Sequence, residues 1–167
     1  MDILKIAEEL KLPDWLIGAG FVRSKVWDHL HGYKTRNLPS DIDLVYFDKD
    51  KKYDDVEINK RLSAQRPDLE WEVVNQATVH NIGEENLNIS TADAISKWPE
   101  TVTAVGVKLE NGKLKLIAPL GIKDLVTMTV RPTPFFMATE IRRNKAKERF
   151  EKKRWFEKWP KLIVVSF

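Results

Sequence analysis

The sequence contains no cysteine among its 167 residues, so it offers neither a disulfide framework nor a thiolate metal site. It also has no apolar run long enough to cross a bilayer, which excludes a membrane-spanning helix. The N-terminal residues show no signal-peptide pattern. These absences together predict a cytoplasmic protein that has no membrane partner.

The composition that is present suits one packed domain over residues 1–167, with 43% hydrophobic and 32% charged residues. The net charge of +3 is modest, but its distribution is uneven. Residues 140–160 hold nine Lys or Arg against four Glu, a balance of +5 that leaves −2 for the rest of the chain.

The basic stretch predicts a C-terminal helix over about 137–159, which Pro160 ends. One interpretation is a solvated face whose Glu, Lys and Arg pair four residues apart. The other is a track for a phosphate backbone or a triphosphate, with RNA or another polyanion as the partner. We favour the solvated face, and we expect Trp155, Phe156 and Trp159 to anchor the helix in the core because their spacing follows one helical stripe.

Residues 16–47 organise the chain, and they begin with an apolar run that breaks at Gly18-Ala19-Gly20. Glycines at such a turn tolerate positive φ and let the backbone approach a ligand closely. The apolar spacing after the turn predicts a helix, whose N-terminal N–H groups favour a phosphate. Arg23 falls in the first turn of this helix, where it can reach a phosphate or pair with Asp41.

The second half of this stretch reads Ser40-Asp41-Ile42-Asp43-Leu44 and predicts a strand. Asp41 and Asp43 then share one face, about 6.6 Å apart along the strand. At an effective dielectric near 20 their repulsion costs about 2.5 kcal/mol. A divalent cation such as Mg²⁺, which binds carboxylates and substrate phosphates, would reverse that repulsion. The alternative is a solvated strand edge.

A third strand over residues 69–76 brings further polar candidates. Glu72 or Glu70 can add a third carboxylate to the aspartate pair, and we favour Glu72 because it lies in mid-strand. The alternative is that both glutamates are solvated. Asn75 and Gln76 can position a base or ribose or can bond backbone groups, and His80 is an outside candidate for a general base.

The remaining apolar patterns predict an α+β fold, with a mixed sheet of about five strands flanked by helices. Asn111-Gly112 between two alternating segments is a strong hairpin signal. Strands are expected at 15–17, 41–47, 69–76, 103–109 and 113–117. Helices are expected at 2–10, 22–30, 56–64, 91–98, 121–130 and 137–159.

Gly18-Ala19-Gly20 followed by Asp41-Ile42-Asp43 resembles the signature of the polymerase-beta-type nucleotidyltransferase superfamily. The segment 19–23 is particularly similar to the start of CCA-adding enzymes and bacterial poly(A) polymerases. Segments 71–77, 94–101 and 131–134 resemble a small, poorly characterised bacterial nucleotidyltransferase-like family. The resemblance covers about residues 15–160. This sequence departs from the pattern in its long spacing between Gly20 and Asp41 and in lacking the common Ser in the turn.

The resemblance implies a palm-like fold and transfer of a nucleoside monophosphate from an NTP to an acceptor hydroxyl, with release of pyrophosphate. It implies that Asp41, Asp43 and Glu72 hold two Mg²⁺ (or Mn²⁺) ions. Binding of the triphosphate is then expected at Gly18, Ala19, Gly20 and Arg23. A full tRNA-tailing enzyme is not expected, because 167 residues leave no room for its additional helical domains.

Two alternatives stay open at this point. The first is a non-catalytic nucleotide- or RNA-binding module on a degenerate version of the fold, which the missing Ser and the long spacing favour. The second is an interaction protein that uses only its basic helix.

Overall fold

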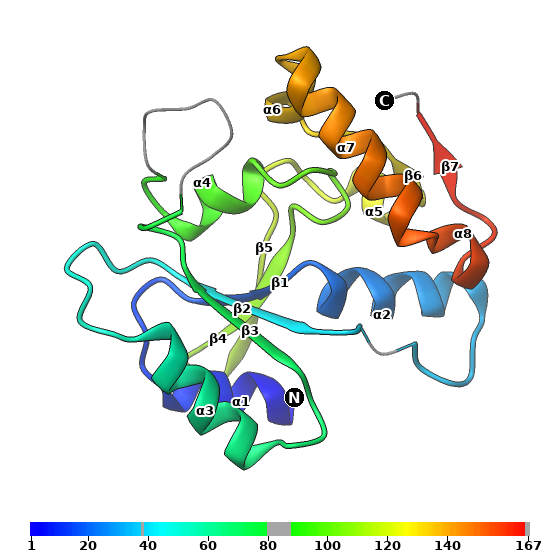
Figure 1. Ribbon diagram of the computed structural model, residues 1–167. Helices are drawn as coiled ribbons and strands as arrows, with labels where there is room; N and C mark the ends of the chain where they lie inside the picture. Colours follow the sequence, from blue (N-terminus) through cyan, green and yellow to red (C-terminus); the bar gives the residue numbers. More distant parts are fainter. Residues whose placement is uncertain (38, 80–87, 166–167) are drawn as a thin grey trace.

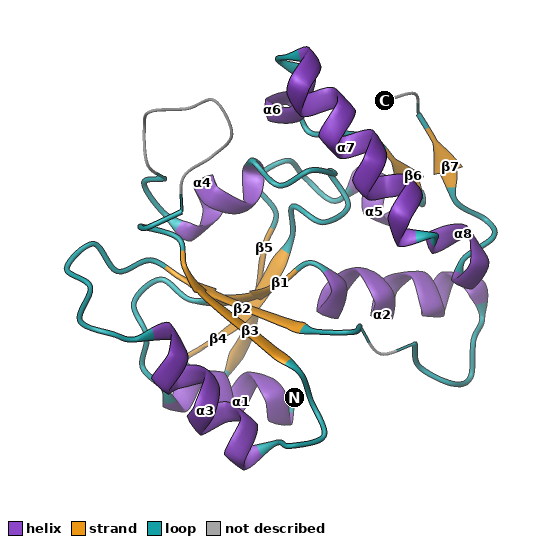
Figure 2. Ribbon diagram, viewed as in Figure 1, coloured by secondary structure: helices purple, strands orange, loops and turns teal. Residues whose placement is uncertain are grey.

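A computed structural model of the chain describes residues 1–37, 39–79 and 88–165. Five strands form one mixed sheet in the order β3-β2-β1-β4-β5, and helices cover both of its faces (Figures 1 and 2). The predicted α+β class is therefore confirmed. The strands of this sheet are β1 (Leu16–Gly18), β2 (Ile42–Tyr46), β3 (Trp71–Asn75), β4 (Gly106–Glu110) and β5 (Lys113–Ile117).

Local sequence signals explain where several of the helices begin and end. Asp54 accepts hydrogen bonds from the N–H groups of Val56 and Glu57 at the start of α3, and Ser90 accepts one from Asp93 at the start of α4. Gly32 ends α2 with φ of 71°. The helices are α1 (Asp2–Glu9), α2 (Gly20–His31), α3 (Asp55–Gln65), α4 (Thr91–Ser96), α5 (Lys123–Val126), α6 (Pro134–Met137), α7 (Glu140–Lys153) and α8 (Trp155–Lys158).

The register of the sheet places the conspicuous acidic residues side by side. β1 and β2, which flank α2 in the sequence, pair antiparallel with Leu16 opposite Val45. β2 and β3 pair parallel with Asp43 opposite Glu72. β4 and β5 form the predicted hairpin, in which Asn111 and Gly112 both adopt positive φ.

The two faces of the sheet have different roles. One face is buried under α1 and α3 and supplies much of the main core, including Ile17, Leu44 and Tyr46, all of them buried. On the other face Leu16 and Val45 pack against Ile95 of α4. That second face also carries the acidic residues of β2 and β3, which lie next to this smaller apolar cluster.

The predicted C-terminal helix over about 137–159 is instead two helices, α7 and α8, and only the last residue of α6 falls within its range. Thr139 caps α7, accepting a hydrogen bond from the N–H of Arg142, and Arg154 ends α7 in a left-handed conformation with φ of 47°. The break turns Trp155 and Trp159 onto Trp27 of α2, with ring centroids 5.6 and 5.3 Å apart.

These contacts confirm two of the three expected aromatic anchors. Trp155 and Trp159 are buried, whereas Phe156 is 40% exposed and packs edge-on against Phe150.

The helix expected at 121–130 is also shorter than predicted. α5 ends because Met128 takes a positive φ of 55°, and the chain continues as β6 (Thr129–Val130). β6 pairs in parallel with β7 (Ile163–Val164), so the end of the chain returns to the body of the protein. Because a pairing between segments over 30 residues apart has no local signal, the sequence pattern could not show it.

Candidate functional site

Three carboxylates lie close together on the open face of the sheet, where β2 and β3 begin. Asp43 lies opposite Glu72 in the parallel pair, and Asp41 precedes β2 on the same side. One carboxylate oxygen of each residue lies within 4.8 Å of the others. We call Asp41, Asp43 and Glu72 the carboxylate triad.

Glu70, the alternative third carboxylate, lies outside the carboxylate triad. It precedes β3 and is exposed, and its backbone oxygen accepts a hydrogen bond of 2.8 Å from the N–H of Ile42. Together with Ile42 it borders a separate small pocket. The structure thus places Glu72, and not Glu70, beside the two aspartates.

The environment of Asp43 favours its protonated form. Burial, together with the charges of Asp41 and Glu72, raises the pKa of this carboxyl from 3.8 to about 7, against the opposing effect of Arg23 and Arg149. Ionising all three carboxylates without a cation is costly, because their charges repel. Their oxygens form a donor set that fits Mg²⁺ or Mn²⁺.

The turn at Gly18-Ala19-Gly20 works differently from the expectation. The positive φ falls on Ala19 (40°), and its N–H donates to the backbone oxygen of Val105 at 2.9 Å, so this N–H is committed to the fold. Gly18 is needed for space, since a Cβ there would lie 2.6 Å from the ring of Trp98. Gly20 borders the cleft and opens α2. The N–H groups of Val22 and Arg23 donate to the backbone oxygen of Ala19, which leaves those of Gly20 and Phe21 without an acceptor within the helix.

Arg23 lies deep beside the triad. It is 8% exposed, and its guanidinium carbon is 4.2 Å from the ring centroid of Trp155 and 5.4 Å from that of Trp27. Burial lowers the pKa of Arg23 to about 10, although Glu100 and the two aspartates raise it. No ion pair joins it to Asp41 in the described part of the chain; Asp41 instead accepts a 2.6 Å hydrogen bond from the Ser40 hydroxyl.

Glu100 is a fully buried carboxylate that was not among the site residues expected from the sequence. Its Oε1 lies 3.2 Å from Nε of Arg149, an ion pair whose angle falls outside hydrogen-bonding range. Its Oε2 accepts a 3.0 Å hydrogen bond from the Thr103 hydroxyl. Burial raises the pKa of Glu100, while Arg149 and Arg23 hold it down. Glu100 thereby ties α7 to the layer that carries the triad.

The triad and these basic residues border one cleft of about 600 Å³. Its cationic side consists of residues from α2, α7 and α8, which we call the basic wall: Arg23, Arg149, Lys153 and Lys158. Part of the basic stretch therefore lines a cleft, which corrects the simple solvated-face interpretation. The spacing of four residues between Arg149 and Lys153 was the available signal, because such residues share one helix face.

Other basic residues of the same stretch have structural partners. Arg142 is 6% exposed and stacks on Phe135, with its guanidinium carbon 3.8 Å from the ring centroid. Arg143 donates to the backbone oxygen of Met137 at 2.8 Å. Lys145, Lys147 and Lys152 are exposed.

The remaining sequence candidates separate clearly. Asn75 is occupied by the backbone of Asp48, accepting from its N–H at 3.0 Å and donating to its oxygen at 2.8 Å. Gln76 lines the cleft. His80 lies outside the described residues.

Comparisons with known proteins agree on the fold. A family model described as nucleotidyltransferase matches residues 5–164. An NMR structure described as revealing a CCA-adding enzyme head domain is 36% identical with a TM-score of 0.88, over 100% of this chain and 89% of that chain. Comparison with curated proteins gives no match.

Two longer enzymes share the fold at low identity. A tRNA nucleotidyltransferase complexed with a primer tRNA and an incoming ATP analog has a TM-score of 0.54 and 19% identity over 98% of this chain and 46% of that chain. The Thermotoga maritima CCA-adding enzyme complexed with tRNA has a TM-score of 0.58 and 16% identity over 98% of this chain and 38% of that chain. This chain therefore spans less than half the length of either enzyme.

Within residues 1–37, 39–79 and 88–165, no helix is both long enough and apolar enough to cross a membrane.

Proposed function

Since the chain belongs to the nucleotidyltransferase family, we propose that it moves a nucleoside monophosphate from an NTP to an acceptor hydroxyl and releases pyrophosphate. The observation that carries this proposal is the carboxylate triad, with its oxygens within 4.8 Å of one another, facing the basic wall across one cleft. An acidic cluster alone suits a cation, and a basic wall alone suits an anion. The pair suits a metal-bound triphosphate.

Asp41, Asp43 and Glu72 would hold Mg²⁺ or Mn²⁺. When bound, such ions neutralise charge on the phosphates and activate the attacking oxygen. Ser40 supports this set, because its hydroxyl donates to Oδ1 of Asp41 at 2.6 Å and fixes that carboxylate. Because its pKa is about 7, the carboxyl of Asp43 is mostly protonated below that pH and mostly ionised above it.

The triphosphate would lie between the start of α2 and the basic wall. The N–H groups of Gly20 and Phe21 at the start of α2 offer hydrogen bonds to phosphate oxygens, whereas those of Val22 and Arg23 already donate to Ala19. Arg149 is oriented by its ion pair with Glu100, and Lys153 follows one turn later on α7. Because Ala19 has committed its N–H to Val105, this turn contributes fewer backbone donors than the resemblance implied.

The acceptor is proposed to be RNA or another polyanion that reaches the exposed surface of α7. Lys145 and Lys152 lie on one side of this helix and Lys147 on another, and all three are exposed. The two longer enzymes of the same fold are described as tRNA complexes, which makes RNA the natural first probe. A cytoplasmic location is part of the same proposal, since NTPs and RNA are both found there.

Pyrophosphate release tests the proposal directly. Wild-type protein is incubated with each of the four NTPs, Mg²⁺ or Mn²⁺, and RNA acceptors. We expect release with at least one combination and at least a hundredfold loss in Glu72→Gln. Glu70→Gln is the matched control, because it makes the same change two residues earlier and outside the triad.

The result also separates the alternative function. Metal-dependent NTP binding without pyrophosphate release would favour a non-catalytic nucleotide-binding module. The observation that favours this module is that the Ala19 N–H already donates to Val105 and is not free to bind a phosphate. Absence of NTP binding would refute both.

A further inference from the structure

The cleft continues beyond the carboxylate triad along β2 and β3, where its chemistry changes. On the same sheet face, the acidic residues are followed by Val45 on β2, by Val74 on β3 and by Gln76 directly after β3. At about 3.3 Å per residue, Gln76 lies about 13 Å beyond Glu72 along the strand. Trp98 completes this end and belongs to one apolar cluster with Val45 and Val74.

Gln76 is the polar group of this far end. The residue is 5% exposed and lines the cleft, and its side-chain amide has no hydrogen-bond partner among the described residues. An amide both donates and accepts, and because its two polar atoms are not among the described side-chain atoms that are buried without a partner, they are open to the cleft. The amide therefore points to a ligand that offers an acceptor and a donor together.

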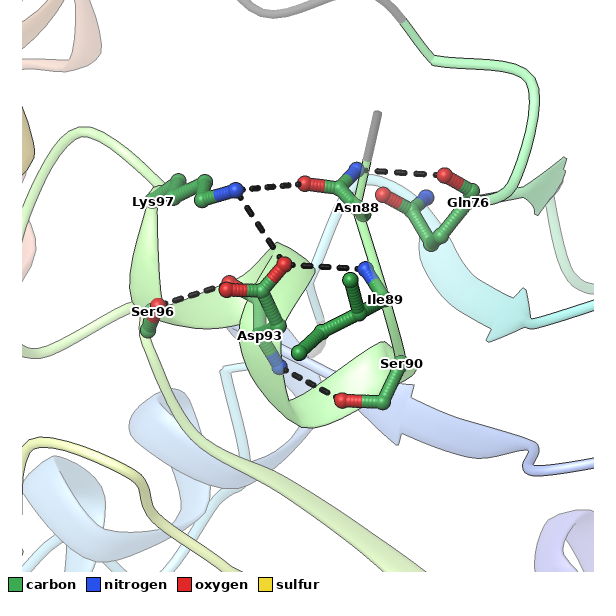
Figure 3. A network of polar contacts seen from close by, with 7 residues as sticks. All are labelled: Gln76, Asn88, Ile89, Ser90, Asp93, Ser96 and Lys97. Atoms are coloured by element: carbon green, nitrogen blue, oxygen red, sulfur yellow. Dashed lines mark hydrogen bonds and ion pairs between the residues drawn. The ribbon is translucent and has the colours of Figure 1, made fainter. Parts of the chain in front are cut away.

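The backbone holds Gln76 in place and leaves its side chain available. In Figure 3 a dashed line reaches its backbone oxygen, which accepts a 3.1 Å hydrogen bond from the buried Asn88 side chain. Lys97 in turn donates to Asn88 at 3.3 Å. The Gln76 N–H donates to the backbone oxygen of Tyr46 at 2.7 Å. A side chain on so fixed a backbone is suited to selective hydrogen bonding.

We propose that Val45, Val74, Gln76 and Trp98 form a nucleobase subsite, in which the Gln76 amide hydrogen-bonds the edge of the base. A base has apolar faces, which suit the valines and the Trp98 ring, and an edge of adjacent donors and acceptors, which suits an amide. The basic wall, by contrast, suits phosphates. This inference rests on the proposed function, and the base belongs either to the NTP or to the terminal nucleotide of the acceptor.

Binding measurements on the full chain separate these sources. In the first arm, dissociation constants are measured for Mg²⁺-tripolyphosphate and for each Mg²⁺-NTP. In the second arm, adenosine, guanosine, cytidine and uridine are titrated into protein saturated with Mg²⁺-tripolyphosphate. Both arms compare wild type with Gln76→Leu. Gln65→Leu, the same change on an exposed position of α3, is the control.

We expect a base-dependent gain of at least tenfold over tripolyphosphate in the first arm if the base belongs to the NTP. If it belongs to the acceptor, we expect nucleoside binding in the second arm. In Gln76→Leu the gain or the nucleoside binding is lost, while tripolyphosphate affinity and the melting temperature stay within twofold and about 2 °C of wild type.

Two results are decisive against the account, and they differ from each other. If Gln76→Leu keeps the wild-type behaviour in both arms, the nucleobase subsite is wrong and the proposed function stands. If wild type binds neither tripolyphosphate nor any NTP, the proposed function is wrong and the subsite is overturned with it.

Discussion

Asp43 sits where burial and two neighbouring carboxylates raise its pKa from 3.8 to about 7. The folded protein therefore holds this proton across a pH range in which the unfolded chain has released it. The stabilising contribution is complete below about pH 4 and is lost as the pH rises to about 7. The difference in pKa corresponds to at most about 4 kcal/mol in the metal-free protein.

Asp43→Asn should remove this pH dependence. Asparagine has a similar shape and no charge, so in EDTA the variant should gain stability over wild type between pH 4 and 7. The gain should level off above pH 7. Chemical denaturation at several pH values measures it. An equal change in Asp50→Asn, at an exposed turn position, or a variant less stable than wild type at pH 8, would contradict this account of the site.

The same proton should oppose metal binding. Because cation binding requires the ionised carboxylate, apparent Mg²⁺ affinity should rise with pH up to about pH 7 and then become constant. Calorimetric titration at pH 5.5, 6.5, 7.5 and 8.5 tests this. A pH-independent affinity would show that Asp43 is not part of the metal site.

Gly18→Ala tests why the turn needs a glycine. A Cβ there would lie 2.6 Å from Cη2 of Trp98, so we expect a loss of about 1–3 kcal/mol in stability from overpacking. Adding Trp98→Leu removes that ring and should recover part of the loss, which is measured by denaturation of both variants. No recovery in the double variant would place the cause in the backbone instead.

At the scale of elements, α7 is held to the site through a buried charge. Glu100 compensates Arg149 and lies near Arg23, with no exposure to solvent. Glu100→Gln should therefore destabilise the free protein by about 3–5 kcal/mol, because two cations lose their buried partner. The loss should shrink when Mg²⁺-tripolyphosphate supplies the missing negative charge. Thermal melts with and without this ligand measure the difference, and an equal loss in both would contradict it.

Helix α7 is the element expected to bind RNA, through the lysines on its exposed surface. Changing Lys145, Lys147 and Lys152 to Glu should weaken RNA binding and reduce its salt dependence, while NTP binding stays unchanged. The matched control changes three exposed lysines elsewhere: Lys5, Lys60 and Lys123. Equal weakening by both sets, measured over a salt series, would reduce the effect to net charge.

At the scale of the whole molecule, local patterns predicted the parts that local physics decides. The alternation around Asp41 and Asp43 gave their shared face, and Asn111-Gly112 gave the hairpin. The break of the basic stretch at Arg154 was not predictable, because it depends on Trp155 and Trp159 packing on Trp27 over 120 residues away.

The candidate site divides in the same way. The acidic half lies on two strands whose pattern is visible in the sequence, whereas the basic wall comes from three helices that meet only in the fold. Glu100 lies in a segment that resembles a known family, but its burial against Arg149 is seen only in the fold. Sequence reasoning therefore brought together the three carboxylates and Arg23, and it left the basic stretch between two interpretations.

The central claim is that the carboxylate triad and the basic wall hold one metal-bound triphosphate between them. A crystal structure with Mn²⁺ and a non-hydrolysable NTP analogue, recorded with anomalous scattering, tests it most directly. We predict a Mn²⁺ peak about 2.0–2.2 Å from oxygens of Asp41, Asp43 and Glu72, with phosphate oxygens facing Arg149 and Lys153. Manganese bound elsewhere, or a triphosphate outside this cleft, would contradict the account.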